Sequence, residues 1–341
     1  MYSLIRSILF RFNPERAHHI ALGVLHFLCK LPFGGHLLKA LYAPKLNQKT
    51  VFGLTFSNPV GIAAGFDKNA DHVEVLSHLG FGFIEVGSVT ARPCDGNERP
   101  RLFRLPLDRG IINRMGLNNR GAMAAVQKIN KIERKTPLFV NIAKTPDPEL
   151  EGARGVEDYC TSARIVRDVA DVLVVNISCP NSGDGRTFED PEALDALLAG
   201  IRSEIGQDGP PMVVKVSPDL SPEHLTQVVE ISGRYDVAGF TATNTTISRD
   251  ELKTSDQRLE EIGRGGLSGH PVHSRSVDTV RRLRAQTDLP IIGVGGIMGP
   301  AEARAFIEAG ATLVQVYTGF VYQGPGIVKS VSSALKIDEP T

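Results

Sequence analysis

The 341-residue chain lacks the features that mark several broad classes of protein. Its four cysteines are scattered and form no C-x-x-C pair, which argues against a zinc site or a disulfide framework and fits a reducing compartment. Its formal net charge is zero, so nothing global indicates nucleic acid as a partner. No run reaches the ~18 apolar residues that span a bilayer. Arg6 and Arg11 bracket too short an apolar run for a cleavable signal.

The first fifty residues differ from the rest in charge and in pattern. They carry seven lysines and arginines against one acidic residue, Glu15. Their apolar residues recur at helical spacing from Leu4 to Leu28, and Pro32 to Gly35 interrupt the run. The spacing predicts short amphipathic helices with basic flanks, which either lie at a membrane surface or cap the main domain. We take 1–45 as a helical, membrane-associating segment and 46–341 as the main domain.

From residue 60 onward, short apolar runs alternate with amphipathic segments of helix length. Asp190-Pro191 and Ser221-Pro222 each place a capping side chain before a proline, as at the start of a helix. The predicted strands are 60–65, 83–90, 138–143, 171–178, 212–218, 239–244, 291–296 and 313–319. The predicted helices are 121–130, 157–169, 191–205, 222–234, 273–286 and 300–309.

This alternation predicts the fold class. Near-continuous apolar strands are typical of a parallel sheet that is covered on both faces. Eight such units predict an α/β fold, a (β/α)8 TIM barrel, with a small N-terminal helical domain. Two gaps are longer than simple loops: 91–137, which predicts a small hairpin, and 245–270, a candidate active-site lid.

Polar residues gather where the predicted strands end, and active sites of TIM barrels lie at those ends. They include two lysines, several amides and hydroxyls, but no carboxylate pair for glycosidase chemistry and no His/Asp/Glu cluster for a divalent metal. Asparagine both donates and accepts hydrogen bonds, which suits a flat ligand such as a flavin or a pyrimidine. The glycine stretches 265–269 and 293–297 lie beside the last two strands, where phosphate commonly binds backbone N–H groups. Together these features favour FMN in a barrel, with a planar polar substrate over it.

The same residues carry a resemblance that runs in order along essentially the whole chain. The segments are AAGFDKNA (63–70), PRLFR (100–104), INRMGLNN (112–119), VNISCPN (175–181), KVSPDL (215–220), ATNTT (242–246), GGLSG (265–269), IIGVGGI (291–297) and VQVYTGF (314–320). They resemble the successive motifs of the dihydroorotate dehydrogenase family. NPERAHH (13–19) is similar to the membrane-associated, quinone-linked class of that family.

The resemblance implies oxidation of (S)-dihydroorotate to orotate in pyrimidine biosynthesis. A hydride would leave carbon 6 of the substrate for nitrogen 5 of FMN, and the electrons would pass to a quinone. It also implies a peripheral position on the cytoplasmic face of a bacterial-type cell membrane, held by the N-terminal helices. The implied FMN contacts are Ala64, Gly65, Phe66, Asp67, Lys68, Ser88, Asn141, Asn176, Lys215, Thr243, Gly269, Gly296, Tyr317 and Thr318. The implied substrate contacts are Lys68, Asn113, Arg114, Met115, Gly116, Leu117, Asn176, Asn181, Asn244 and Thr245. The quinone-site candidates are His18, Arg104 and Tyr317.

Cys179 takes the position of the catalytic base that the resemblance implies. The quinone-linked class usually has serine there, and the soluble classes usually have cysteine. A free thiol has a pKa of ~8.5, closer to neutrality than a hydroxyl, and a general base works best near the operating pH. The alternative role is a small buried hydrophobe with no catalytic part.

Other departures from the family leave alternatives open. Leu117 stands where phenylalanine is usual, and residues 182–190 differ from the usual continuation. Both bear on the substrate loop, so a different dihydropyrimidine or ene substrate, or a soluble acceptor, is an alternative reading. A barrel lyase or isomerase without flavin and a non-catalytic membrane scaffold are further alternatives. Asp67 also has a second reading, as the cap of a loop that never touches ligand.

The base assignment yields a prediction. Replacing Cys179 with alanine is expected to slow flavin reduction by dihydroorotate by several orders of magnitude while FMN stays bound, because only the proton acceptor is lost. Single-turnover stopped-flow absorbance measures the rate. Near-wild-type reduction in the variant would refute the assignment.

Overall fold

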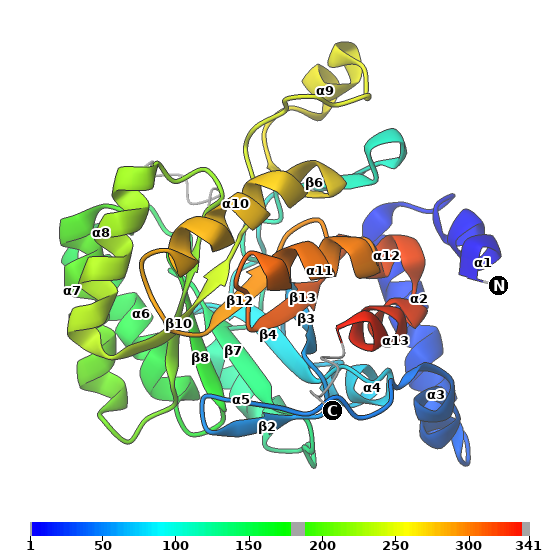
Figure 1. The fold of residues 1–341 in the computed structure, drawn as a ribbon, viewed down its shortest axis with the longest axis horizontal. Helices are drawn as coiled ribbons and strands as arrows, with labels where there is room; N and C mark the ends of the chain where they lie inside the picture. The colour runs from blue at the N-terminus through cyan, green and yellow to red at the C-terminus, as the bar shows by residue number, and fades with distance from the viewer. Residues whose placement is uncertain (1, 179–187, 336–341) are drawn as a thin grey trace.

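The computed structural model describes residues 2–178 and 188–335, so Cys179 and Asn181 lie outside the described residues. Its centre is a closed barrel of eight parallel strands, which confirms the predicted TIM barrel (Figure 1). Around the barrel the order is β10-β12-β13-β3-β4-β7-β8-β9, so neighbours in space follow one another in the chain. The strands are β3 (Val60–Asp67), β4 (Phe83–Val89), β7 (Leu138–Ile142), β8 (Val172–Asn176), β9 (Met212–Val216), β10 (Val237–Ala242), β12 (Ile291–Val294) and β13 (Leu313–Val316).

Helices cover the outside of the barrel, and all six predicted ones form. The Asp190 side chain accepts from the backbone N–H groups of Glu192 and Ala193, and that of Ser221 accepts from His224 N–H, as the cap pattern predicts. The predicted helices are α5 (Ala122–Ile129), α6 (Ala153–Val166), α7 (Pro191–Ile205), α8 (Pro222–Ser232), α10 (His273–Arg284) and α11 (Pro300–Glu308). Among the described residues, the α-helices that were not predicted are α4 (Val73–His78), α9 (Asp256–Ile262), α12 (Thr318–Gln323) and α13 (Gly326–Ala334).

The inside of the barrel is built in layers, because every second side chain of a strand points inward. The lower layer is apolar: Phe83, Phe139 and Val213 belong to one buried cluster with residues of β8, β12 and β13. A hairpin of β1 (Lys49–Val51) and β2 (Leu54–Phe56) closes this end, where the ring centroid of Phe56 lies 5.5 Å from that of Phe83. Two residues further along the strands the inward side chains become polar, and that layer is the floor of the site.

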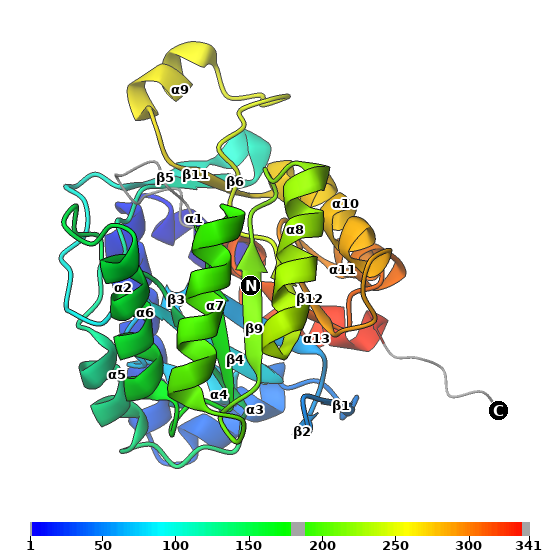
Figure 2. The same ribbon diagram turned by 90° about the vertical axis from the view of Figure 1, so that its left-hand side faces the viewer.

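A three-stranded antiparallel sheet, in the order β11-β6-β5, lies at the mouth of the barrel. It is made of β5 (Leu102–Leu105), β6 (Gly110–Asn113) and β11 (Gly266–Gly269). The first two strands form the hairpin predicted in 91–137, and β11 comes from the 245–270 insertion. The rest of that insertion carries α9 (Asp256–Ile262), which projects away from the barrel (Figure 2). Only the two ends of the insertion therefore lie at the mouth of the barrel, and its role as a lid stays a prediction.

Three helices precede the barrel, as the N-terminal pattern predicts: α1 (Tyr2–Leu9), α2 (Pro14–Lys30) and α3 (Gly34–Tyr42). They lie together on one side of the molecule, at the right of Figure 1. An ion pair of 2.9 Å between Glu15 and Arg101 ties the start of α2 to the barrel domain. Within the described residues, no helix alone has the length and apolarity of a membrane span; α2 and α3 meet that measure only as a pair, bent by 117°.

Candidate active site

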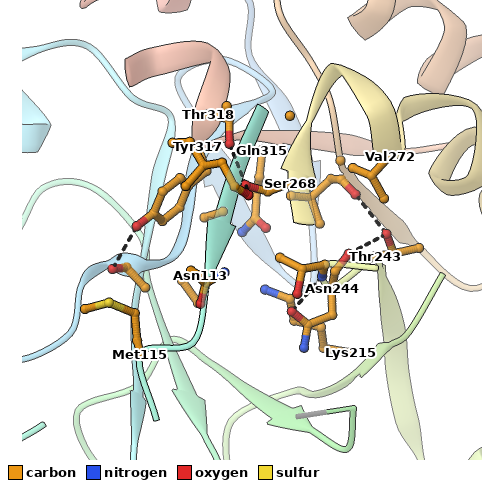
Figure 3. Close-up of a pocket in the computed structure, with 18 of the residues that line it drawn as sticks. Asn113, Met115, Lys215, Thr243, Asn244, Ser268, Val272, Gln315, Tyr317 and Thr318 are labelled. Atoms are coloured by element: carbon orange, nitrogen blue, oxygen red, sulfur yellow. Dashed lines mark hydrogen bonds between the residues drawn. The ribbon is translucent and has the colours of Figure 1, made fainter. Parts of the chain in front are cut away.

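A cavity of about 160 Å³ opens at the C-terminal mouth of the barrel. Figure 3 shows Tyr317 and Met115 on one side, and Lys215, Thr243 and Asn244 on the other. Most of the predicted FMN and substrate residues line this cavity. They are Ala64, Gly65, Lys68, Ser88, Asn113, Met115, Gly116, Leu117, Asn176, Lys215, Thr243, Asn244, Thr245, Gly269, Gly296, Tyr317 and Thr318.

Some predicted residues lie elsewhere. Phe66 and Asp67 face a second cavity, and the Asp67 carboxylate accepts from backbone N–H groups of its own loop, at 2.9 Å from Asp71 and 2.7 Å from His72. This is the loop-capping reading of Asp67. Asn141 is fully buried beneath the cavity.

Arg114 also points away from the cavity. Its guanidinium lies 4.6 Å from the ring centroid of Phe103 and donates to the carbonyl oxygen of Arg264 at 3.0 Å, after the end of α9. The Arg114 side chain is therefore directed away from a ligand in this cavity, contrary to the predicted substrate contact. Its neighbours Asn113 and Met115 do line the cavity, because successive residues of an extended segment point to opposite sides.

A hydrogen-bonded chain of polar side chains forms the floor. Asn176 Nδ2 donates to Ser88 Oγ at 3.2 Å, and the Ser88 hydroxyl donates to Asn141 Oδ1. Asn141 Nδ2 in turn donates to Glu85 Oε1 at 2.7 Å, and Gln315 Nε2 donates to Glu85 Oε2. Neither Glu85 nor Gln315 is among the predicted site residues. The signal that marks both is a polar residue inside an apolar strand run, FIEV and LVQV.

Asn244 completes the polar lining on the opposite side. Its Nδ2 donates to the carbonyl oxygen of Ser178 at 2.7 Å and lies 3.4 Å from Asn176 Oδ1. Ser178 is buried, and its hydroxyl also donates to the carbonyl oxygen of Lys215 at 3.3 Å. These hydrogen bonds fix the segment that follows β8 beside the cavity as far as Ser178, the last described residue before Cys179.

Glycine forms the wall near β12 and β13. Gly269 and Gly296 have φ of 93° and 69°, which disfavour residues with a side chain. A Cβ at Gly269 would lie 2.4 Å from the carbonyl oxygen of Arg109, and one at Gly296 would lie 2.6 Å from His273 Cβ. Both positions therefore require glycine, and both line the cavity on the side where the sequence predicts a phosphate.

The second cavity, of about 220 Å³, lies between the N-terminal helices and the barrel. The three quinone-site candidates, His18, Arg104 and Tyr317, all line it. The two cavities adjoin, because six residues line both: Gly65, Lys68, Leu102, Ile111, Met115 and Tyr317. Burial raises the pKa of Tyr317 to about 12, so its phenol stays protonated and donates to the carbonyl oxygen of Gly65 at 3.4 Å.

Burial lowers the pKa of two histidines beside this cavity, His18 and His72. Burial lowers the pKa of His18 to about 4, with smaller contributions from His72, His19 and Lys68. Burial also lowers the pKa of His72, which His26 approaches with Nε2 2.8 Å from Nδ1 of His72. The His18 ring packs edge-on against Phe66 at 4.8 Å between centroids. Near neutral pH, this wall therefore presents a neutral imidazole to the cavity.

Fold and site together define a barrel enzyme with a polar pocket at its mouth. Comparison with known proteins narrows the class. The family description "Dihydroorotate dehydrogenase" matches residues 46–337. Proteins named dihydroorotate dehydrogenase (quinone) from Christiangramia forsetii and Rhodococcus erythropolis are each 43% identical to this chain, over 339 and 340 residues, and cover 98% of it, with 98% and 94% of their own lengths matched.

Solved structures agree with these relatives. The structure of DHODH from Eimeria tenella in complex with ferulenol has a TM-score of 0.82 and 32% identity, covering 94% of this chain and 90% of its own. The chain belongs to the dihydroorotate dehydrogenase family.

The depressed pKa of His18 predicts a pH dependence of stability. In the unfolded chain a histidine has a pKa of about 6.5, so between pH 6.5 and about 4 the unfolded state binds more protons. The stability due to neutral His18 is complete above pH 6.5 and is lost as the pH falls toward 4, by at most about 3 kcal/mol. Urea unfolding at several pH values measures it.

The control is His36, which is exposed on α3. His18→Asn is expected to flatten the dependence of the unfolding free energy on pH in this window, and His36→Asn is expected to leave it as in the wild type. The same slope in His18→Asn and in the wild type would contradict the prediction.

Proposed function

We propose that this chain oxidises (S)-dihydroorotate to orotate, a step of pyrimidine biosynthesis, with FMN as cofactor and a membrane quinone as electron acceptor. The chain belongs to the dihydroorotate dehydrogenase family, and the relative from Christiangramia forsetii is named dihydroorotate dehydrogenase (quinone). The observation that carries the proposal is the pair of cavities that share Gly65 and Tyr317. One has the polar lining that a planar substrate and a flavin need, and the other lies against the N-terminal helices.

The residues of the polar cavity fit FMN. Gln315 Oε1 is buried without a hydrogen-bond partner in the described residues, so it can accept from a ring N–H. Lys215 and Asn176 supply donors at the floor and Ser88 Oγ an acceptor, and the backbone of Gly269 and Gly296, which lines the cavity, suits a phosphate. When bound, FMN supplies the hydride acceptor; the protein supplies position and charge.

The substrate is recognised by the asparagines at the mouth. Asn113, Asn176 and Asn244 present amide donors and acceptors to the carbonyl and N–H edge of a cyclic imide. Lys68 brings positive charge, which favours the carboxylate of dihydroorotate. Cys179 accepts the proton from carbon 5. The residue before it, Ser178, donates to the carbonyl oxygen of Lys215 and accepts from Asn244 beside the cavity.

The N-terminal helices guide the quinone and rest on the membrane at the cytoplasmic face. Leu37 and Leu41 of α3 are exposed by 61% and 55%, and Phe33, the residue just before α3, is exposed by 80%. Residues spaced by four lie side by side on a helix, so Leu37 and Leu41 share one face; with Phe33 we call them the apolar stripe. Basic residues flank it, which suits an anionic lipid surface.

The proposed reaction predicts a colour and its loss. The purified protein is expected to show the visible absorbance of bound flavin, and anaerobic dihydroorotate is expected to bleach it. Added quinone should then restore it. Retained absorbance after dihydroorotate, with bleaching by a different dihydropyrimidine, would favour another substrate. Colourless protein that binds no added FMN would refute the proposal.

The membrane role predicts an effect confined to the apolar stripe. The double substitution Phe33→Ser with Leu37→Ser is expected to weaken binding to anionic lipid vesicles at least tenfold, because each side chain contributes roughly 1.5–3 kcal/mol when buried. Vesicle co-sedimentation measures it. Leu107, which is 68% exposed on the barrel domain, gives the control Leu107→Ser with unchanged binding. Equal binding of the double variant and the wild type would contradict the prediction.

A further inference from the structure

Glu85 is a carboxylate buried inside the barrel, and the proposed reaction gives it no part. It lies on β4 one inward position above Phe83, and its side chain is 0% exposed. Buried charges of this kind are costly unless they are paired and hydrogen-bonded. The partners of Glu85 therefore indicate what its charge is for.

Three side chains from three other strands meet this carboxylate. Asn141 Nδ2 donates to Oε1 at 2.7 Å, and Gln315 Nε2 donates to Oε2 at 2.5 Å. The ammonium of Lys215 lies 3.6 Å from Oε1, and its side chain is only 7% exposed. Amide N–H groups and ammonium groups can only donate, so both carboxylate oxygens act as acceptors.

Each of these partners either lines the cavity or contacts a residue that lines it. Lys215 and Gln315 line it directly, and Asn141 accepts the hydroxyl of Ser88, which also lines it. Glu85 itself does not line it. Glu85 is therefore a positioning residue: it acts through the groups that meet the ligand.

The charge of Glu85 has a further consequence at this depth. The side chains of Lys215 and Glu85 are 7% and 0% exposed, so their charges interact more strongly with nearby charges than they would in water. Uptake of electrons adds negative charge to a flavin. The Lys215 ammonium favours that change, and the Glu85 carboxylate opposes it.

We infer that Glu85 sets the reduction potential of FMN bound in this site. It fixes the Lys215 ammonium and the Gln315 amide at the floor, and its negative charge offsets the positive charge of Lys215. This rests on the proposed function, since it requires FMN in the cavity. With the pair intact, the floor is close to neutral. FMN is then neither trapped in its reduced form nor made hard to reduce, which lets it serve both dihydroorotate and quinone.

The test is the reduction potential of bound FMN in Glu85→Gln, measured by spectroelectrochemical titration of the intact protein. Loss of the carboxylate is expected to make the potential more positive. The ratio of reduced to oxidised FMN at a given potential should rise at least tenfold over the wild type, which is about 30 mV for a two-electron couple. Thr241→Val is the matched control, because Thr241 is a fully buried residue of β10 and the change is neutral in charge. Its potential is expected to equal that of the wild type.

A potential in Glu85→Gln that is unmoved or more negative, with FMN bound, overturns the inference alone. Wild-type protein that is colourless and binds no added FMN overturns the proposed function and this inference with it. If Glu85→Gln does not fold, Lys215→Met is compared with the double variant Glu85→Gln/Lys215→Met, in which the ion pair is replaced by neutral side chains. The double variant is expected to have the more positive potential by the same tenfold ratio, and equal potentials overturn the inference.

Discussion

The inward alternation of side chains in a closed parallel barrel is the constraint on which the rest of the structure depends. Because each strand points every second residue to the axis, one layer of aromatic and aliphatic side chains around Phe83 and Phe139 fills the lower barrel. The next layer up carries Glu85, Asn141, Lys215 and Gln315. The apolar layer thus supports a polar floor joined by hydrogen bonds and an ion pair, and this floor positions the groups that line the cavity.

The same alternation explains why much of the fold could be predicted from the sequence. Strands buried on both faces are continuous apolar runs, and capped helices follow them, so all eight strands and six helices were predictable. The strand-end residues converged because parallel strands of a barrel share one mouth. What the sequence could not place are features that depend on distant partners. The direction of Arg114 is set by carbonyl groups near α9, about 150 residues later in the chain.

Glu85 and Gln315 illustrate a different limit. A polar residue within an apolar strand run is visible in the sequence, but its meaning depends on which strands are neighbours in the closed barrel. Glu85 and Gln315 are separated by 230 residues and meet only because β13 lies beside β3, which lies beside β4. Asp67 shows the reverse case: its motif points to ligand, yet its carboxylate is used to hold the loop that carries His72.

We propose that the barrel mouth holds FMN against a small cyclic imide, with Cys179 as the proton acceptor. A crystal structure of the protein grown with orotate tests this most directly. We expect FMN over Lys215 and Gln315, with orotate between the flavin and the asparagines and the Cys179 sulfur facing carbon 5. Orotate bound elsewhere, or a Cys179 sulfur turned away from it and packed among apolar side chains, would contradict the account.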